Sequence, residues 1–269
     1  ADATSAGLPP PRRDAVLHTE GPLLGLAGPG SGKTRVITRR IAYLVRCGIP
    51  PWQVLALTFT NKAAAEMRER VHALLGGADS RATRGLTVTT FHALCARLLR
   101  KYAPIAGLPG LDANFVIYDT DDQTTLLKKA IEALDLSTTN WPARSVLSRI
   151  SDAKNKLIDA ETFAGQQADF YGRTLAKIYA AYQKGLRAAD AVDFDDLLVL
   201  TARMLRENAE VREDCRRRWQ YLLVDEYQDT NKAQFVIAAL LAGEAAARRQ
   251  NLCFVSDPHQ AISGRRRAD

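Results

Sequence analysis

The stretch LLGLAGPGSGKTR, residues 23–35, connects a short apolar run to a series of helix-forming residues through a loop that contains three glycines. Glycine tolerates positive φ and lets the backbone approach a ligand closely, so such a loop can direct several N–H groups at one anion. The positive end of the following helix attracts the same anion. A chance glycine-rich turn rarely has this strand-to-helix context, so the pattern predicts a phosphate-binding loop.

The loop matches the G-x-x-x-x-G-K-[ST] pattern except that Ala27 replaces the first glycine. Lys33 is expected to reach the β- and γ-phosphates of ATP, and the Thr34 hydroxyl to ligate Mg²⁺. Pro29 has no N–H, so its position must be one that makes no phosphate hydrogen bond. The predicted nucleotide-binding residues here are Ala27, Gly28, Pro29, Gly30, Ser31, Gly32, Lys33, Thr34 and Arg35.

Five short runs of apolar or β-branched residues, each followed by polar or glycine-containing turn residues, are typical of strands buried on both faces. They are residues 23–26, 54–58, 86–90, 221–224 and 252–255. Helical spacing follows the first three runs, which is the pattern of βαβ units. The sequence therefore predicts an α/β fold with an open, doubly wound parallel sheet.

Strand patterns give way to helical periodicity in the middle of the chain. A capping box formed by Thr120 and Gln123 is expected to begin one helix, and Pro142 to occupy the first position of another. We therefore expect an all-helical insert to interrupt the α/β domain. The predicted ranges are 1–113 and 191–269 for the α/β domain and 114–190 for the insert.

The stretch YLLVDEYQDT, residues 221–230, predicts a buried strand that ends in Asp225 and Glu226. Ligands bind at the carboxyl edge of open α/β sheets, where these side chains would lie. Asp225 suits Mg²⁺, and Glu226 suits deprotonation of the water that attacks the γ-phosphate. Gln260 follows another predicted strand and is suited to a single amide hydrogen bond with the γ-phosphate.

The composition of the 269-residue chain narrows the class of protein. Its formal net charge of +7 and pI near 9.3 favour a polyanionic partner, although a merely basic surface explains them nearly as well. No apolar stretch is long enough to cross a bilayer, and the first residues lack the apolar core of a signal peptide. Cys47, Cys95, Cys215 and Cys253 form no C-x-x-C pair, so we expect reduced, cytosolic thiols.

In this order, the motifs resemble those of superfamily 1 DNA helicases of the UvrD/Rep/PcrA kind. The resemblance covers most of the chain from about residue 21 and includes LTFTNKAAAEMRER (57–70), VTTFHALCARLLR (88–100), FVIYDTDDQ (115–123), VDFDDLL (192–198) and LLVDEYQDTN (222–231). It implies a RecA-like P-loop NTPase core and a helical insert that contacts DNA. The implied activity is a 3′-to-5′ helicase of DNA repair or replication, in the bacterial cytoplasm, whose ATPase is stimulated by single-stranded DNA.

The resemblance also implies two DNA-contacting segments after the second and third strands. These residues are Thr58, Phe59, Asn61 and Lys62 in the first segment and Thr90, Phe91 and His92 in the second. An aromatic face can stack on any base, but Phe59 and Phe91 could equally be core aromatics and His92 a structural imidazole. Gln228 resembles the residue that connects the hydrolytic strand to the nucleotide, and Gln260 resembles a γ-phosphate sensor.

The sequence departs from the family pattern near both ends. Arg12 stands where the family has a glutamine that reads adenine, and arginine has no hydrogen-bond acceptor, so adenine selectivity is not implied. Ser263 and Arg265 stand where the family has aromatic residues, and Arg267 where it has glycine. Arg265 and Arg266 are still expected to bind DNA phosphates, with weaker and more salt-dependent affinity.

The start without Met and the ending SGRRRAD lead us to expect part of a longer protein. The second motor core, whose arginines close the ATP cleft in the family, is expected to lie outside this chain. We therefore expect the chain alone to hydrolyse ATP slowly or not at all. The alternative is a non-catalytic nucleic-acid-binding module with a degenerate helicase fold. A small-molecule kinase would share the phosphate-binding loop but would not need the DNA-facing segments, so this class of protein is much less favoured.

Overall fold

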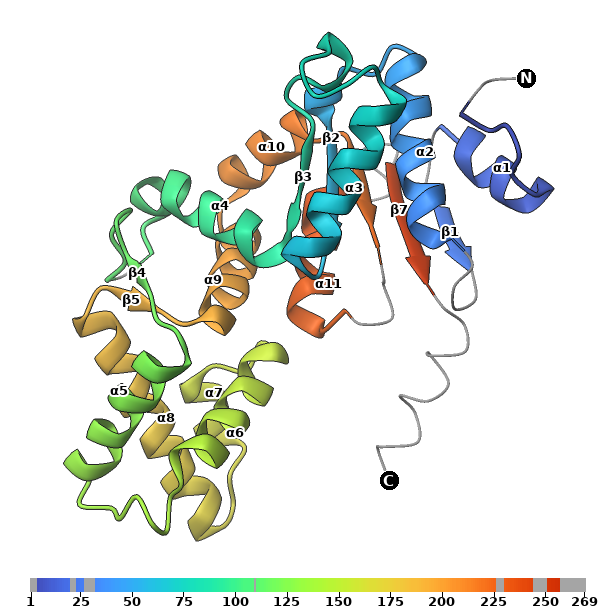
Figure 1. Cartoon of the computed structure of the whole chain (residues 1–269). Helices are drawn as coiled ribbons and strands as arrows, with labels where there is room; N and C mark the ends of the chain where they lie inside the picture. The colour runs from blue at the N-terminus through green and yellow to red at the C-terminus, as the bar shows by residue number, and fades with distance from the viewer. Residues whose placement is uncertain are drawn as a thin grey trace. The chain divides into compact units, whose positions relative to one another are not determined.

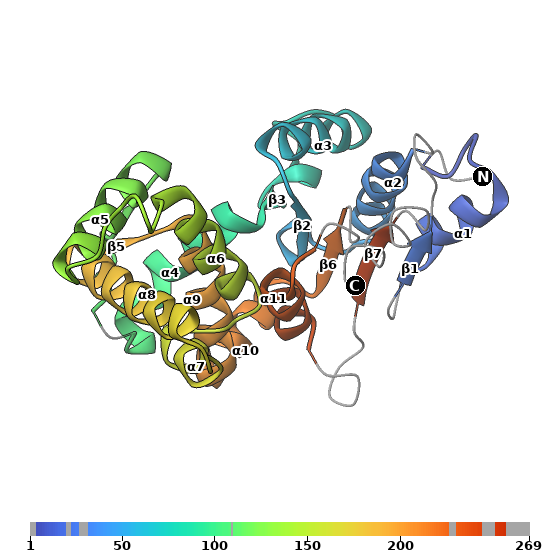
Figure 2. The ribbon, with the colours of Figure 1, turned by 90° about the horizontal axis from the view of Figure 1, so that it is seen from below.

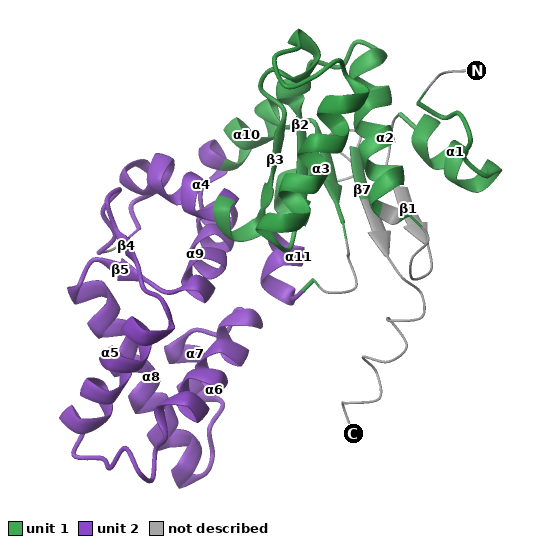
Figure 3. Cartoon of the chain, viewed as in Figure 1, with its two compact units in different colours: residues 1–93, 212–230, 238–269 green, residues 94–211, 231–237 purple. Residues whose placement is uncertain are grey.

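The structure, a computed structural model, falls into two compact units, which are coloured separately in Figure 3. The residues that it describes are 4–19, 23–26, 32–108, 110–225, 230–243 and 251–256. Unit 1 comprises residues 1–93, 212–230 and 238–269, and unit 2 comprises residues 94–211 and 231–237. Unit 2 includes more residues than the predicted insert, which comprises residues 114–190. The predicted domain boundaries remain a prediction.

Unit 1 is built on a five-stranded parallel sheet with the strand order β1-β7-β6-β2-β3 (Figure 1). The strands are β1 (Leu23–Leu26), β2 (Val54–Thr58), β3 (Thr87–Thr90), β6 (Tyr221–Val224) and β7 (Asn251–Ser256). They confirm the five predicted strands to within one residue at each end. Every residue of β2 and β6 is buried, as expected for inner strands of a sheet covered on both faces.

The helices of unit 1 cover the sheet and carry its core. Helices α2 (Lys33–Arg46) and α3 (Asn61–Leu74) lie on the same face, as Figure 2 shows from below. Alternate strand residues point toward these helices, because side chains in a strand alternate between the two faces. The core on this face includes Ile37, Ile41, Leu44, Val54, Ala56, Met67, Val71, Val88, Leu223 and Cys253. The first helix, α1 (Pro10–Leu17), contacts α2. Helix α10 (Ala209–Arg218) starts in unit 2 and ends in unit 1.

Unit 2 is mainly helical. Its elements are α4 (Phe91–Ala106, whose first turn belongs to unit 1), β4 (Val116–Ile117), α5 (Thr120–Ala133), α6 (Ala143–Asn155), α7 (Ala160–Gly165), α8 (Phe170–Ala188), β5 (Ala191–Val192), α9 (Phe194–Glu207) and the start of α11 (Lys232–Ala242). The expectation of an all-helical insert is wrong in one detail, because β4 lies inside it and pairs in parallel with β5. Two residues are too few to show an alternating pattern in sequence.

The core of unit 2 follows the predicted helical spacing, but two predicted helix starts are displaced by one residue. Buried apolar side chains on α8 include Leu175, Ile178, Tyr182 and Leu186. Asp119 and Asp122 form the capping box of α5 in place of Thr120 and Gln123, because carboxylates interact best with the positive end of a helix. Pro142 precedes α6 as its N-cap. None of the described helices has the length and apolar character needed to cross a membrane.

Candidate nucleotide- and DNA-binding sites

The predicted site residues of unit 1 follow the carboxyl ends of its strands. Because the sheet is parallel, these ends share one edge of the sheet, where open α/β folds bind ligands. β1 leads toward α2, and Asp225 directly follows β6, while β2 and β3 lead directly into the two predicted DNA-contacting segments. The nucleotide side and the DNA side of the predicted site therefore belong to the same edge (Figure 1).

Thr34 and Asp225 come together although they are 191 positions apart in sequence. The Thr34 hydroxyl donates a hydrogen bond to Asp225 Oδ2 at 3.3 Å. Asp225 is 5% exposed, and its backbone N–H donates to the Leu57 carbonyl oxygen at 3.1 Å, which continues the β2–β6 pairing past the end of β6. The sheet therefore fixes the backbone position of this carboxylate.

A hydroxyl and a carboxylate are oxygen ligands of the kind that Mg²⁺ prefers. The described residues contain no group of three or more His, Cys, Asp or Glu side chains that could hold a metal ion. Mg²⁺ usually takes one or two protein ligands and completes its shell with water and substrate phosphates. The Thr34–Asp225 pair has the chemistry of such a site.

The start of α2 has the backbone that a phosphate-binding loop requires. Gly32 is the N-cap of this helix and has φ 75° and ψ 37°, a left-handed conformation that favours glycine. A Cβ atom at Gly32 would lie 3.8 Å from Nη1 of Arg12 and 3.7 Å from Cβ of Arg35. The Arg12 side chain, from α1, thus lies beside the end of the loop, and its role in nucleotide binding remains a prediction.

Arg40 holds α1 in place, although no sequence pattern singles it out. Arg40 is buried on α2, and its Nη1 atom donates to the carbonyl oxygens of Ala15 (2.9 Å) and His18 at the end of α1. Burial lowers the pKa of this guanidinium. An arginine in an amphipathic helix is usually exposed, so no sequence signal distinguished Arg40 from its neighbours.

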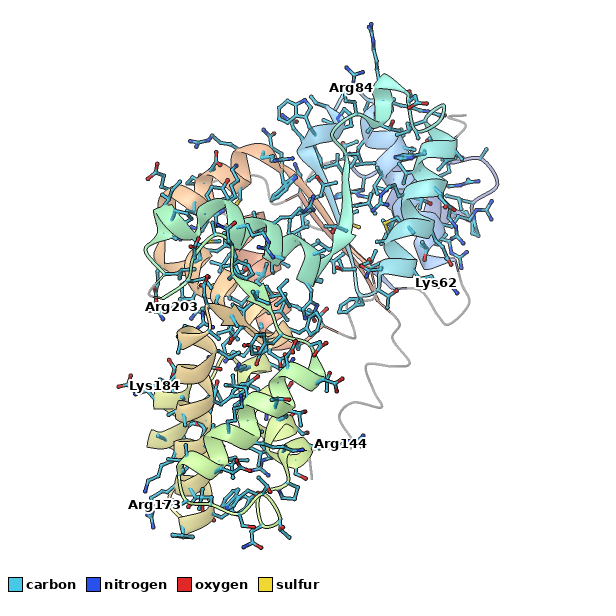
Figure 4. All side chains as sticks on the ribbon, turned by 60° about the vertical axis from the view of Figure 1, so that its left-hand side comes forward. Lys62, Arg84, Arg144, Arg173, Lys184 and Arg203 are labelled. Carbon is cyan, nitrogen blue, oxygen red and sulfur yellow. The ribbon has the colours of Figure 1, made fainter. Side chains whose placement is uncertain are left out.

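The first predicted DNA-contacting segment joins β2 to α3. Thr58 is buried and donates to the Thr60 carbonyl oxygen at 3.2 Å, while the Thr60 hydroxyl caps α3 by accepting from Ala63 N at 3.1 Å. Asn61 and Lys62 are exposed in the first turn of α3, and Lys62 is labelled in Figure 4. A lysine at the positive end of a helix is well placed to bind a phosphate.

The second segment joins β3 to α4 in a similar way. Thr90 is buried and accepts a hydrogen bond from Ala93 N at 3.2 Å, which caps the first turn of α4. Phe91 is 1% exposed, and the centroid of its ring lies 5.7 Å from that of the half-buried Phe59. His92 is half-buried, and burial lowers its pKa, which favours the neutral imidazole. Of the two aromatic rings, Phe59 has the greater exposure for base stacking.

Part of the predicted site lies outside the described residues. These residues are Ala27, Gly28, Pro29, Gly30, Ser31, Glu226, Gln228, Gln260, Arg265 and Arg266. The backbone of Lys33 is described as the first residue of α2, but its side chain is not. The roles of these residues remain predictions.

In unit 1, the first strand of a parallel sheet leads through a glycine-rich sequence to a helix, and a buried aspartate follows a nearby strand. These features define a RecA-like P-loop core. The family described as UvrD/REP helicase N-terminal domain matches residues 8–269. The chain belongs to this family.

Three curated relatives show how much of a longer protein this chain matches. It is 44% identical over 266 residues to the ATP-dependent DNA helicase PcrA of Bacillus subtilis (strain 168), covering 98% of this chain and 34% of the relative. It is 46% identical to the ATP-dependent DNA helicase PcrA of Leuconostoc citreum, over 95% of this chain and 33% of the relative. It is 44% identical to the ATP-dependent DNA helicase UvrD1 of Mycobacterium leprae (strain TN), over 95% of this chain and 34% of the relative. The chain thus spans about a third of the length of these relatives.

Proposed function

We propose that this chain is the first motor core, with its helical insert, of an ATP-dependent DNA helicase. The proposed enzyme moves 3′ to 5′ along single-stranded DNA and serves DNA repair or replication in the bacterial cytoplasm. The observation that supports it best is the hydrogen bond between Thr34 and Asp225, because it pairs two oxygen ligands beside the phosphate-binding sequence. The names of the relatives, ATP-dependent DNA helicases, support the same assignment.

In this proposal the nucleotide lies along residues 27–35, and Lys33 contacts its β- and γ-phosphates. Thr34 and Asp225 hold Mg²⁺, which when bound offsets the negative charge of the phosphates. Glu226 accepts the proton of the attacking water, Gln228 connects the hydrolytic strand to the nucleotide, and Gln260 senses the γ-phosphate. Arginines of a second motor core, in another part of the protein, complete the cleft.

The proposed substrate is single-stranded or partly duplex DNA. Phe59 stacks on a base, and Lys62 and the helix start at Asn61 contact the backbone. Thr90 and His92 contribute a second contact, with Phe91 supporting the ring of Phe59 from the core. Arg265 and Arg266 add contacts to phosphate, which makes the affinity depend on salt.

The test compares ATP hydrolysis by the full-length protein that contains this chain and by its Glu226→Gln variant, each with and without single-stranded DNA. We expect DNA to stimulate the wild-type rate, and the variant to lose at least about a hundredfold in rate while it still binds the nucleotide. Equal rates for the two proteins would establish the alternative, a non-catalytic nucleic-acid-binding module. That alternative is favoured by the altered residues at 12 and 263–267.

A further inference from the structure

The edge of the unit 1 sheet at which the strands begin is opposite to the edge that carries the predicted ATP and DNA sites. Trp52, Gly85 and Trp219 lie two residues before β2, β3 and β6, which are neighbours in the sheet. The Gln220 backbone N–H donates to the Gln53 carbonyl oxygen at 2.9 Å, so the pairing of β6 with β2 extends beyond the first residues of both strands. The residues before these three strands therefore form one continuous edge.

Trp52 is a large apolar side chain on this edge. It is 46% exposed, and the half-buried Pro50 and Pro51 precede it. Gly85 allows the close approach of Trp52, because a Cβ atom at Gly85 would lie 2.9 Å from Trp52 Cβ and 3.5 Å from Trp52 Cα. Gly85 also has φ 83°, in the region that favours glycine. The prolines and the glycine thus restrict the backbone that carries the exposed indole ring.

Exposed arginines flank Trp52 on both sides. Arg84 lies on the β3 side, and Figure 4 shows Arg84 and Lys62 at opposite ends of unit 1. Arg218 lies on the β6 side, and its Cζ atom is 5.1 Å from the centroid of the Trp219 ring. Neither Arg84 nor Arg218 has a carboxylate partner among the residues that the structure describes. Both guanidinium groups are therefore open to a carboxylate from another molecule.

The charge of this edge is positive. Segments 79–84 and 213–218 carry five arginines and three carboxylates. Two of the carboxylates already pair with arginines of their own helix, at 2.8 and 3.4 Å. One carboxylate therefore remains for three arginines, Arg81, Arg84 and Arg218. This surplus of positive charge favours an acidic partner.

We propose that the tryptophan edge, defined by Trp52, Arg81, Arg84 and Arg218, docks an acidic segment of a partner protein. An apolar side chain of that segment packs on the indole ring, and its carboxylates pair with the arginines. Tryptophan and arginine are enriched at the positions that contribute most to the affinity of protein interfaces. Arginine also binds carboxylates in a bidentate manner. Docking here leaves the opposite edge of the sheet open to the nucleotide.

A protein segment suits the tryptophan edge better than single-stranded DNA does. Proteins that bind single strands without sequence preference use several aromatic rings, on which successive bases stack. Trp219 is only 7% exposed, so of the two tryptophans Trp52 alone offers an open ring. The predicted DNA-contacting residues also follow the other ends of β2 and β3. This last point rests on the proposed function, whereas the surface itself does not.

The experiment selects peptides from a displayed library of random sequences, using the full-length protein that contains this chain. We expect the enriched peptides to combine aspartate or glutamate with a large apolar residue. The Kd of a labelled, enriched peptide, measured by fluorescence anisotropy, is expected to rise at least about tenfold in Trp52→Ala and in Arg84→Glu. Arg13→Glu makes the same charge change at an exposed position on α1 and is the matched control, with a Kd expected within about twofold of the wild type.

A labelled single-stranded oligonucleotide is titrated in parallel. Its Kd is expected to change by less than about twofold in Trp52→Ala and in Arg84→Glu. If this Kd rises at least about tenfold while peptide binding is unchanged, the tryptophan edge is a nucleic-acid contact and the proposal is overturned.

The remaining outcomes are equally decisive. A selection that enriches no acidic peptide would overturn the proposal, as it would if another part of the same protein covers the tryptophan edge. Enriched peptides that bind both variants as tightly as the wild type would place their site elsewhere. If Trp52→Ala does not fold, Arg84→Glu decides alone, because Arg84 is exposed. A full-length protein without DNA-stimulated ATP hydrolysis would overturn the proposed function and leave the peptide result unaffected.

Discussion

The rings of Phe59 and Phe91 lie 5.7 Å apart and meet at an interplanar angle of 49°, where the neighbouring strands β2 and β3 end. They differ in burial: Phe91 is 1% exposed, whereas Phe59 is half-buried. A ring in the core contributes to stability, and a ring with an open face can stack on a nucleobase. The two residues are therefore expected to give opposite results when they are truncated.

Phe91→Ala is expected to reduce the free energy of unfolding by about 3–5 kcal/mol, because it leaves a cavity in the core. Phe59→Ala is expected to cost less stability but to weaken binding of single-stranded DNA by about 1–3 kcal/mol. Denaturant unfolding and fluorescence anisotropy with a labelled oligonucleotide measure the two effects. Unchanged DNA affinity in Phe59→Ala would remove this ring from the DNA interface.

Lys154→Met is expected to destabilise the protein by about 3–5 kcal/mol, because it leaves the carboxylates of Asp193 and Asp196 buried without their lysine. Lys156→Met, two positions further on and exposed, is the matched control and is expected to change stability by less than about 0.5 kcal/mol. Urea unfolding of both variants checks this difference. Similar losses in both would show that the buried ion pairs contribute little.

Asp195 is expected to make stability depend on pH. Burial raises its pKa from 3.8 to about 6, with Asp193 and Asp196 adding to the rise and Ser151 and Lys154 opposing it. The folded state therefore binds this proton more tightly than the unfolded state does. The resulting stabilisation is fully present below pH 3.8 and is lost as the pH rises through about 6.

The variant Asp195→Asn removes this titration. Relative to the wild type, its free energy of unfolding is expected to rise between pH 4 and 6 and then level off, leaving the variant more stable at pH 7. Urea unfolding at several pH values gives the difference between the two proteins, in which the other titrating groups largely cancel. A difference that does not vary with pH would contradict the raised pKa of Asp195.

Arg12→Gln is expected to increase the preference for ATP over GTP by about twofold to tenfold, because glutamine supplies the acceptor for the adenine amino group that arginine lacks. Arg12→Ala is the control, since it removes the guanidinium beside Gly32 without adding an acceptor. Competition binding with the two nucleotides measures the preference. An equal preference in all three proteins would place Arg12 away from the base.

The sequence predicted the sheet well because its strands are continuous apolar runs, which few other structures require. It could not reveal β4 and β5, which are two residues each, and it misplaced the cap of α5 because Asp119 and Thr120 are both favourable cap residues. In the sequence, nothing distinguishes Lys154 from an exposed lysine of an amphipathic helix. Its burial depends on Asp193 and Asp196, which only the tertiary structure brings to it.

Prediction of the candidate sites was limited in the same way by contacts that form only in the tertiary structure. Phe59 and Phe91 both lie where a strand passes into a helix, and no sequence pattern decides which ring is buried. The pairing of Thr34 with Asp225 was predictable, because a phosphate-binding loop and an aspartate after a buried strand meet at one edge of a parallel sheet. The hydrogen bond between Asn155 and Asn231 in unit 2 was not, because neither residue belongs to a recognisable spacing pattern.

The most direct measurement is a crystal structure of this chain with Mg²⁺ and a non-hydrolysable ATP analogue. The predicted result is a triphosphate along residues 28–34, with Mg²⁺ bound by the Thr34 hydroxyl and by Asp225 directly or through water. An analogue bound elsewhere at saturating concentration, or Mg²⁺ that contacts neither side chain, would contradict the proposed nucleotide site.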